Sequence, residues 1–116
     1  MKSTLQTYSI KNKKDIQYIF NKGKVFKTTN LIFYYLIDEE LLYDLHFLIA
    51  IPKKKIKLAT NRNYLKRVLK DCIHREKNRV NKLNTKIKFI VVYNNDTKIK
   101  YLKLEAELLA FLDKFR

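Results

Sequence analysis

The sequence predicts an α+β fold in which helices pack on a four-stranded sheet, in the order α-β-β-β-α-β-α. Three observations support this prediction. The chain of 116 residues is long enough for one domain with a modest core, which we place at residues 1–116. Four short runs are rich in aromatic and β-branched residues, as strands are. Three other segments repeat apolar residues at helical spacing.

The first helix is predicted from Lys13 to Asn21. Asn12 is a suitable N-cap, and Asp15 follows three residues later, as in a capping box. Gly23, the only glycine in the chain, is expected to end the helix in a left-handed conformation. The apolar residues of this helix share one face: Ile16, Ile19 and Phe20.

Four strands and two further helices follow. An acidic loop joins the second and third strands, and Pro52 ends the third because proline cannot donate a hydrogen bond to a neighbouring strand. The predicted strands are Lys24 to Lys27, Leu31 to Ile37, His46 to Ile51, and Ile87 to Tyr93. A long basic helix is expected from Ala59 to about Lys77, followed by a polar segment from Asn78 to Thr85. A last helix carries an apolar stripe from Tyr101 to Phe115.

The most informative stretch runs from Pro52 to Lys70. Past the proline it holds eight Lys or Arg residues in eighteen positions and no acidic residue. At about 100° per residue, the polar side chains of the helical part fall in one sector of roughly 140°. They are Arg62, Asn63, Lys66, Arg67 and Lys70. Leu65, Val68 and Cys72 fall on the opposite side, which would anchor the helix in a core.

A basic stripe that includes an asparagine suits phosphate oxygens and ribose hydroxyls. A solvated helix face is the alternative, but such a face usually mixes both signs of charge. The net charge of +15 favours a nucleic acid or an anionic membrane as partner. No apolar run approaches the roughly 20 residues that span a bilayer. The absence of an apolar signal segment and the single, buried-looking Cys72 indicate a reducing, cytoplasmic location.

Residues for independent catalysis are not evident. The two histidines, His46 and His74, lie far apart and have no cysteine or acidic partner at the spacing of a metal site or an activated nucleophile. No glycine-rich phosphate loop is present, since Gly23 stands alone. We therefore predict no catalytic residue, no metal site and no small-molecule substrate for this chain.

Aromatic residues suggest a second surface. Phe20 on the first helix and Tyr34 on the second strand would meet where the helix packs on the sheet. If exposed, they would suit stacking on unpaired bases, with lysines nearby. The alternative is that both rings are simply part of the core.

These features together resemble the protein subunit of bacterial ribonuclease P over nearly the whole chain. KNKKDIQYIFNKGKVF is similar to the opening helix of that family and the Lys-Gly-Lys that follows it. LIFYYL, HFLIAIPKKK and KIKFIVVY are similar to its later strands. ATNRNYLKRVLKD resembles its signature arginine–asparagine helix, which is the most specific part. Tyr64 departs from the usual Arg-Asn-Arg, Leu48 replaces an expected glycine, and Ile16 replaces an expected aromatic residue.

The resemblance implies a function and a set of residues. The protein would bind a catalytic RNA, which with Mg²⁺ held mainly by that RNA would cleave precursor transfer RNA at the 5′ end of the mature sequence. The implied RNA-binding residues are Lys53, Lys54, Lys55, Lys57, Arg62, Asn63, Lys66, Arg67 and Lys70. The implied cleft for the single-stranded 5′ leader contains Ile16, Phe20 and Tyr34. The family also implies a left-handed strand–helix–strand crossover, against the usual right-handed preference.

Two other classes stay open at this point. A structural RNA-binding protein, such as a small ribosomal protein, often combines a basic helix with an α+β sheet. A DNA-binding regulator ranks last, because no second helix is placed for a helix-turn-helix.

Overall fold

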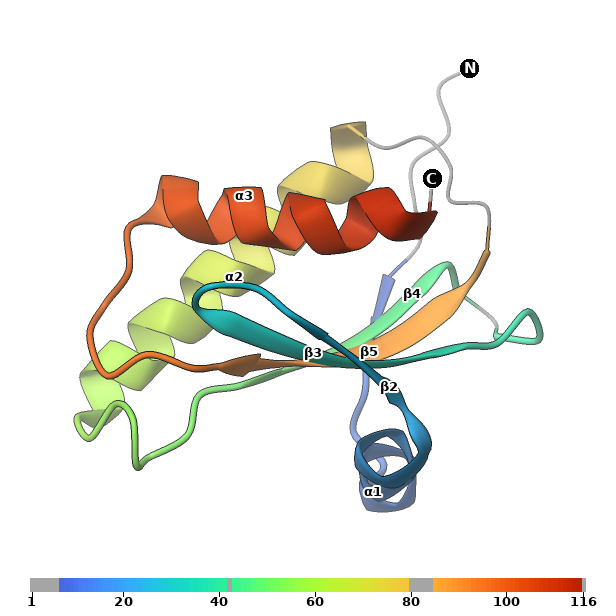
Figure 1. Cartoon of the computed structure of the whole chain (residues 1–116), viewed down its shortest axis with the longest axis horizontal. Helices are drawn as coiled ribbons and strands as arrows, with labels where there is room; N and C mark the ends of the chain where they lie inside the picture. Colours follow the sequence, from blue (N-terminus) through green and yellow to red (C-terminus); the bar gives the residue numbers. More distant parts are fainter. Residues whose placement is uncertain (1–6, 42, 80–84, 116) are drawn as a thin grey trace.

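The computed structural model describes residues 7–41, 43–79 and 85–115 of the chain (Figure 1). The elements occur in the order β1 (Thr7–Ser9), α1 (Lys13–Lys22), β2 (Lys24–Lys27), β3 (Leu31–Ile37), β4 (Leu45–Ala50), α2 (Ala59–Arg79), β5 (Ile87–Tyr93) and α3 (Tyr101–Leu112), with a final 3₁₀ turn at Asp113–Phe115. The predicted α+β class is confirmed, and the basic helix begins at the predicted residue. Part of the predicted polar segment after that helix, residues 80–84, lies outside the described residues.

The sheet has five strands, so the prediction of four was wrong by one. Its strand order is β1-β4-β5-β3-β2. The additional strand, β1, pairs in parallel with β4 at the edge of the sheet, where Tyr8 lies opposite His46. This strand has only three residues, two of them exposed. Such a short, polar segment lacks the alternation that marks a strand in sequence, and only its pairing with β4 defines it.

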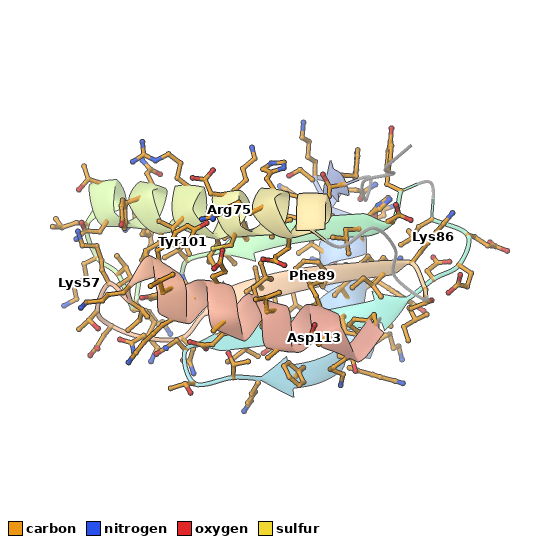
Figure 2. The ribbon with its side chains drawn as sticks, turned by 90° about the horizontal axis from the view of Figure 1, so that it is seen from above. Lys57, Arg75, Lys86, Phe89, Tyr101 and Asp113 are labelled. Atoms are coloured by element: carbon orange, nitrogen blue, oxygen red, sulfur yellow. The ribbon has the colours of Figure 1, made fainter. Side chains whose placement is uncertain are left out.

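The connection from β4 through α2 to β5 is a left-handed crossover. These two strands are parallel neighbours, with Phe47 opposite Phe89 in the register. Seen from the side of α2 with both strands pointing upward, β5 lies to the left of β4 (Figures 1 and 2). The expectation drawn from the family resemblance is therefore confirmed, against the general right-handed preference.

The main core lies between the sheet and the helices α2 and α3, which cover the same face (Figure 1). Because side chains alternate along a strand, every second residue of β3, β4 and β5 points into this core. Its centre is aromatic, and the rings of Phe33 and Phe111 stack with centroids 4.2 Å apart. Arg75 joins the two helices by donating a hydrogen bond of 2.9 Å to the Tyr101 hydroxyl (Figure 2).

Among the described helices, α1 alone packs on the opposite face of the sheet, and it is the short helix below the sheet in Figure 1. Ile19 of α1 is fully buried and packs in a small cluster with Ile10 and Ile90. Asn12 caps the helix as predicted, since its side chain accepts a hydrogen bond of 2.8 Å from the Lys14 amide. Much of this face therefore lies beside α1 and not beneath it, which leaves room for ligands.

The expected left-handed conformation of Gly23 was wrong. Its φ of −72° and ψ of 156° are those of extended backbone, because the chain passes directly from α1 into β2. Glycine is nevertheless required by space. A Cβ atom at this position would lie 2.3 Å from the carbonyl oxygen of Ile19, well inside van der Waals contact.

Candidate nucleic-acid interface

The basic face of α2 borders a hollow beside β4. Leu65 and Leu69 are fully buried in the main core and fix the rotation of the helix. The opposite side of α2 is consequently turned outward, and its cations Lys66, Arg67 and Lys70 are exposed. The hollow between this side and β4 has a volume of about 360 Å³. Four of the predicted RNA-binding residues line it together with residues of the sheet edge: Asn63, Lys66, Arg67, Lys70, Ser9, Phe47, Leu48 and Ile49.

Arg62 does not share this hollow with the other predicted residues. Its side chain is half-buried, and its Nη1 atom donates hydrogen bonds of 2.9 Å to the Ile56 carbonyl and 2.7 Å to the Lys57 carbonyl. Ile56 is itself buried in the main core. Arg62 therefore ties the lysine-rich loop to the first turn of α2, which gives it a structural role that the helical spacing did not reveal.

The lysine-rich loop projects its cations into solvent. A turn closes it at Pro52, whose carbonyl accepts hydrogen bonds from the amides of Lys55 and Ile56. The exposed side chains are Lys53, Lys54, Lys55 and Lys57. These residues extend the basic surface beyond the start of α2, so that loop and helix form one continuous run of positive charge. Tyr64, the departure from the family signature, is exposed on α2 with the Lys98 ammonium 5.1 Å from its ring centroid.

The predicted leader residues come together on the other face of the sheet. Phe20 of α1 and Tyr34 of β3 meet edge to face, with ring centroids 4.9 Å apart. Phe20 keeps 41% of its surface exposed, so the pair is not simply core. Ile16 is partly buried and packs against the same small cluster as Tyr34. We give this set of three residues, Ile16, Phe20 and Tyr34, the name leader groove, after the cleft that the family resemblance implies.

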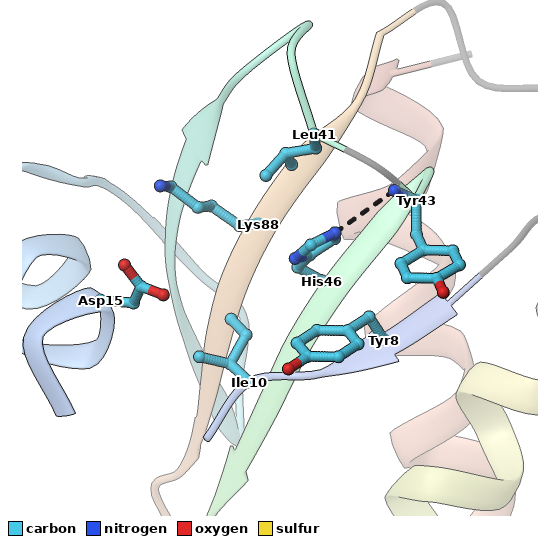
Figure 3. A pocket seen from close by; sticks show the side chains of 7 residues that line it. All are labelled: Tyr8, Ile10, Asp15, Leu41, Tyr43, His46 and Lys88. Carbon is cyan, nitrogen blue, oxygen red and sulfur yellow. Dashed lines mark hydrogen bonds between the residues drawn. The ribbon is translucent and has the colours of Figure 1, made fainter. Parts of the chain in front are cut away.

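A pocket on this face of the sheet was not predicted from the sequence. It has a volume of about 420 Å³ (Figure 3). We call it the tyrosine pocket, and its lining residues are Tyr8, Ile10, Asp15, Leu41, Tyr43, His46 and Lys88. Burial, with a smaller contribution from nearby Lys88, lowers the pKa of His46 below its usual value. In the sequence, the residue that could have indicated this pocket was Lys88, a cation within an otherwise apolar strand.

Two features of the chain bear on other classes of site. Among the described residues, no three His, Cys, Asp or Glu side chains gather as a metal-binding group. No helix in that part of the chain is long and apolar enough to cross a membrane. Cys72 is fully buried, as expected, and burial raises the pKa of its thiol to about 11.

Comparison with known proteins identifies the family. Residues 5–116 match the family model described as Ribonuclease P. The chain belongs to the ribonuclease P protein family. The ribonuclease P protein component of Streptococcus agalactiae is 29% identical to it over 109 residues, which cover 92% of this chain and 93% of the relative.

Solved ribonuclease P proteins share the fold. The protein from Staphylococcus aureus superposes with a TM-score of 0.74 at 22% identity, covering 92% of this chain and 93% of the other. The protein from Thermotoga maritima gives a TM-score of 0.76 at 18% identity, covering 93% and 97%. Family membership decides between the classes that the sequence left open. It supports the ribonuclease P hypothesis, and nothing in the comparisons favours a ribosomal protein.

Proposed function

We propose that this protein binds the catalytic RNA of ribonuclease P and the 5′ leader of precursor transfer RNA, and so assists 5′ maturation of transfer RNA in the cytoplasm. The catalytic centre belongs to the RNA, which also holds most of the Mg²⁺. This chain contributes binding and positioning. It takes no small-molecule substrate and no membrane partner.

The observation that best supports this proposal is the grouping of cations at the hollow beside β4. Lys66, Arg67 and Lys70 line it from one side of α2, and Asn63 adds an uncharged donor and acceptor. Phosphate oxygens accept charge-assisted hydrogen bonds from the cations, and ribose hydroxyls can pair with the amide. The exposed lysines of the preceding loop extend the same positive field. We assign this surface to the catalytic RNA.

The leader groove supports the second half of the proposal. It lies on the face of the sheet that α1 covers, away from the main core. Phe20 and Tyr34 present partly exposed rings there, on which unpaired bases can stack. Precursor transfer RNA has an unpaired leader, whereas the mature product does not. A groove that takes single-stranded RNA therefore distinguishes substrate from product.

The proposal is tested by reconstituting the protein with a ribonuclease P RNA and a precursor transfer RNA. At low Mg²⁺ we expect 5′ cleavage to depend on the protein. The double variant Lys66→Ala/Arg67→Ala should raise the protein concentration needed for half-maximal cleavage by at least tenfold, since each charged contact contributes about 1–3 kcal/mol. Lys103→Ala, an exposed lysine on α3, is the control for general loss of charge.

Two results would contradict the proposal. The first is 5′ cleavage of the precursor by the protein when it is free of RNA. The second is an equal loss of cleavage per charge removed in the control and in the double variant. That result would mean that net charge alone, and not the hollow beside β4, determines RNA binding.

A further inference from the structure

The tyrosine pocket and the leader groove lie on opposite flanks of α1. Ile19 faces the sheet, and at 100° per residue Ile16 and Phe20 fall on one side of it. Asp15 and Tyr18 fall on the other side, where Asp15 lines the tyrosine pocket. Because Ile19 is fully buried against Ile90, a strand of RNA in the groove cannot continue beneath the helix into the pocket. The pocket is thus separate from the leader groove.

Three aromatic rings, Tyr8 of β1, Tyr43 just before β4 and His46 of β4, converge on this pocket (Figure 3). The rings of Tyr8 and Tyr43 are parallel within 5°, with centroids 5.8 Å apart. The Tyr8 and His46 rings have centroids 4.9 Å apart. Tyr8 is nevertheless 44% exposed, although it is paired in the sheet at that position. Its ring therefore offers a flat, oriented platform that is accessible from solvent.

Lys88 places a cation on the same face. The other residues that β5 presents there are apolar, Ile90 and Val92. The Lys88 side chain is only 18% exposed, and its ammonium lies 3.9 Å from an Asp38 carboxylate oxygen and 5.8 Å from the Tyr18 ring centroid. A partly desolvated lysine in the central strand is not explained by packing, since an apolar residue would suit the sheet better. A bound anion would give its ammonium a partner closer than the Asp38 carboxylate.

His46 and Asp15 complete the polar lining. The Nε2 atom of His46 accepts a hydrogen bond of 3.4 Å from the Tyr43 amide, so in the neutral ring the proton lies on Nδ1. His46 thereby retains a donor, and the exposed Asp15 carboxylate supplies an acceptor. A flat platform, a cation, a donor and an acceptor are the groups that recognise the base and phosphate of an unpaired nucleotide.

We propose that the tyrosine pocket binds one unpaired nucleotide of an RNA, with its base stacked on Tyr8 and its phosphate directed toward Lys88. For the identity of that RNA, the inference rests on the proposed function. The volume of about 420 Å³ lies within the range of small-ligand sites, roughly 300–1,000 Å³, and suits a single nucleotide. A purely apolar ligand would shield the Lys88 ammonium further from water without offering it an anion.

The first test uses the free protein and needs no catalytic RNA. Each of the four ribonucleoside 5′-monophosphates is titrated into the full chain, and the ring signals of Tyr8, Tyr43 and His46 are followed by NMR. Ribose 5-phosphate, which lacks the base, is the ligand control. Tyr8→Leu should weaken binding at the remaining pocket signals at least fivefold, because one stack contributes about 1–3 kcal/mol. Tyr64→Leu, at an exposed tyrosine on α2 outside the pocket, should leave binding at these signals unchanged.

Lys88→Met provides an independent variant in case Tyr8→Leu alters the fold. Because Lys88 is proposed to contact the phosphate, this variant should lower the affinity for the nucleotides and for ribose 5-phosphate alike. If no mononucleotide shifts the pocket signals, or if ribose 5-phosphate binds as well as the nucleotides, the proposal is wrong. Neither result bears on cleavage by the reconstituted enzyme, so failure of this site and failure of the proposed function are distinguishable.

The second test identifies the source of the nucleotide. The affinities of the wild-type chain and of Tyr8→Leu are measured for the catalytic RNA alone and for a single-stranded leader oligonucleotide. If Tyr8→Leu lowers the affinity for the catalytic RNA fivefold or more, the pocket is assigned to that RNA. If it lowers the affinity for the oligonucleotide by the same factor, the pocket is assigned to the leader. If neither affinity changes, the mononucleotides bind only at high concentration and the pocket is not an RNA site.

Discussion

Arg62 and Arg67 lie on the same helix and carry the same charge, yet the structure predicts different consequences when each is replaced by alanine. Arg62 donates two hydrogen bonds to carbonyls of the lysine-rich loop. Arg67 is exposed and lines the hollow beside β4. We expect Arg62→Ala to destabilise the fold and Arg67→Ala to affect RNA binding alone.

The expected magnitude follows from the two bonds of Arg62. A hydrogen bond to a charged group contributes about 1.5–3 kcal/mol to stability. Water can replace the guanidinium at the Lys57 carbonyl, which is exposed, more easily than at Ile56, which is anchored in the core. We therefore expect the free energy of unfolding to fall by roughly 1–3 kcal/mol in Arg62→Ala. For Arg67→Ala the change should stay within about 0.5 kcal/mol, as for other surface substitutions.

Urea unfolding of the free protein measures the first difference, and RNA titration over a range of salt measures the second. Arg67→Ala should flatten the salt dependence by about one unit, because one phosphate contact is lost. Arg62→Lys keeps the charge but has a single ammonium head, which cannot hold both carbonyls as a planar guanidinium does. Arg62→Lys should therefore lower the free energy of unfolding and leave the salt dependence of RNA binding unchanged. Equal stability of the two alanine variants would refute the reasoning.

Three further outcomes are expected from other parts of the structure. Phe20→Leu should weaken binding of precursor transfer RNA to the holoenzyme by roughly 1–3 kcal/mol and leave the mature product unaffected, as comparison of the two affinities would show. Glu107→Ala should lower the free energy of unfolding by roughly 2–4 kcal/mol in urea, since its carboxylate accepts bonds from the amide and side chain of buried Asn30. The lowered pKa of His46 means that the unfolded chain takes up a proton first as pH falls below about 6.5. Stability should therefore decrease on acidification, and less so in His46→Gln.

Each of these outcomes has a control and a result that would contradict it. Equal losses for precursor and mature RNA would mean that Phe20 only supports the fold. Glu40→Gln, in an exposed loop, should leave the free energy of unfolding unchanged. If Glu40→Gln lowered it as much as Glu107→Ala does, the bonds between Glu107 and Asn30 would not account for the loss. If wild type and His46→Gln lose stability equally with acid, protonation of His46 does not couple to folding.

Much of the fold follows from local pattern. The strands β2, β3 and β5 were predicted with the observed bounds, because aromatic and β-branched runs flanked by polar residues mark strands clearly. The basic helix was placed by its apolar side, and burial of Leu65 and Leu69 confirms the inferred rotation. The contact between Phe20 and Tyr34 was also foreseen, since both residues occupy the faces on which helix and sheet must pack.

What pattern did not predict depends on contacts between distant or irregular segments. The strand β1 exists only through pairing with β4, far along the chain. The backbone of Gly23 is set by the carbonyl of Ile19 and by the immediate turn into β2, not by a standard helix cap. Helical spacing places Arg62 with the other cations, but its length and its planar donors allow it to reach back to the loop carbonyls.

The two faces of the sheet explain why the fold was easier to predict than the sites. Along β4 and β5 one set of alternating residues, such as Phe47 and Phe89, fills the main core, and the other set faces α1. That helix is only ten residues long and is anchored through Ile19, so it divides the open face without covering it. Residues such as His46 and Lys88 then look like the solvated half of an ordinary strand. Their grouping into a site depends on where α1 and β1 lie, which is a property of the assembled sheet.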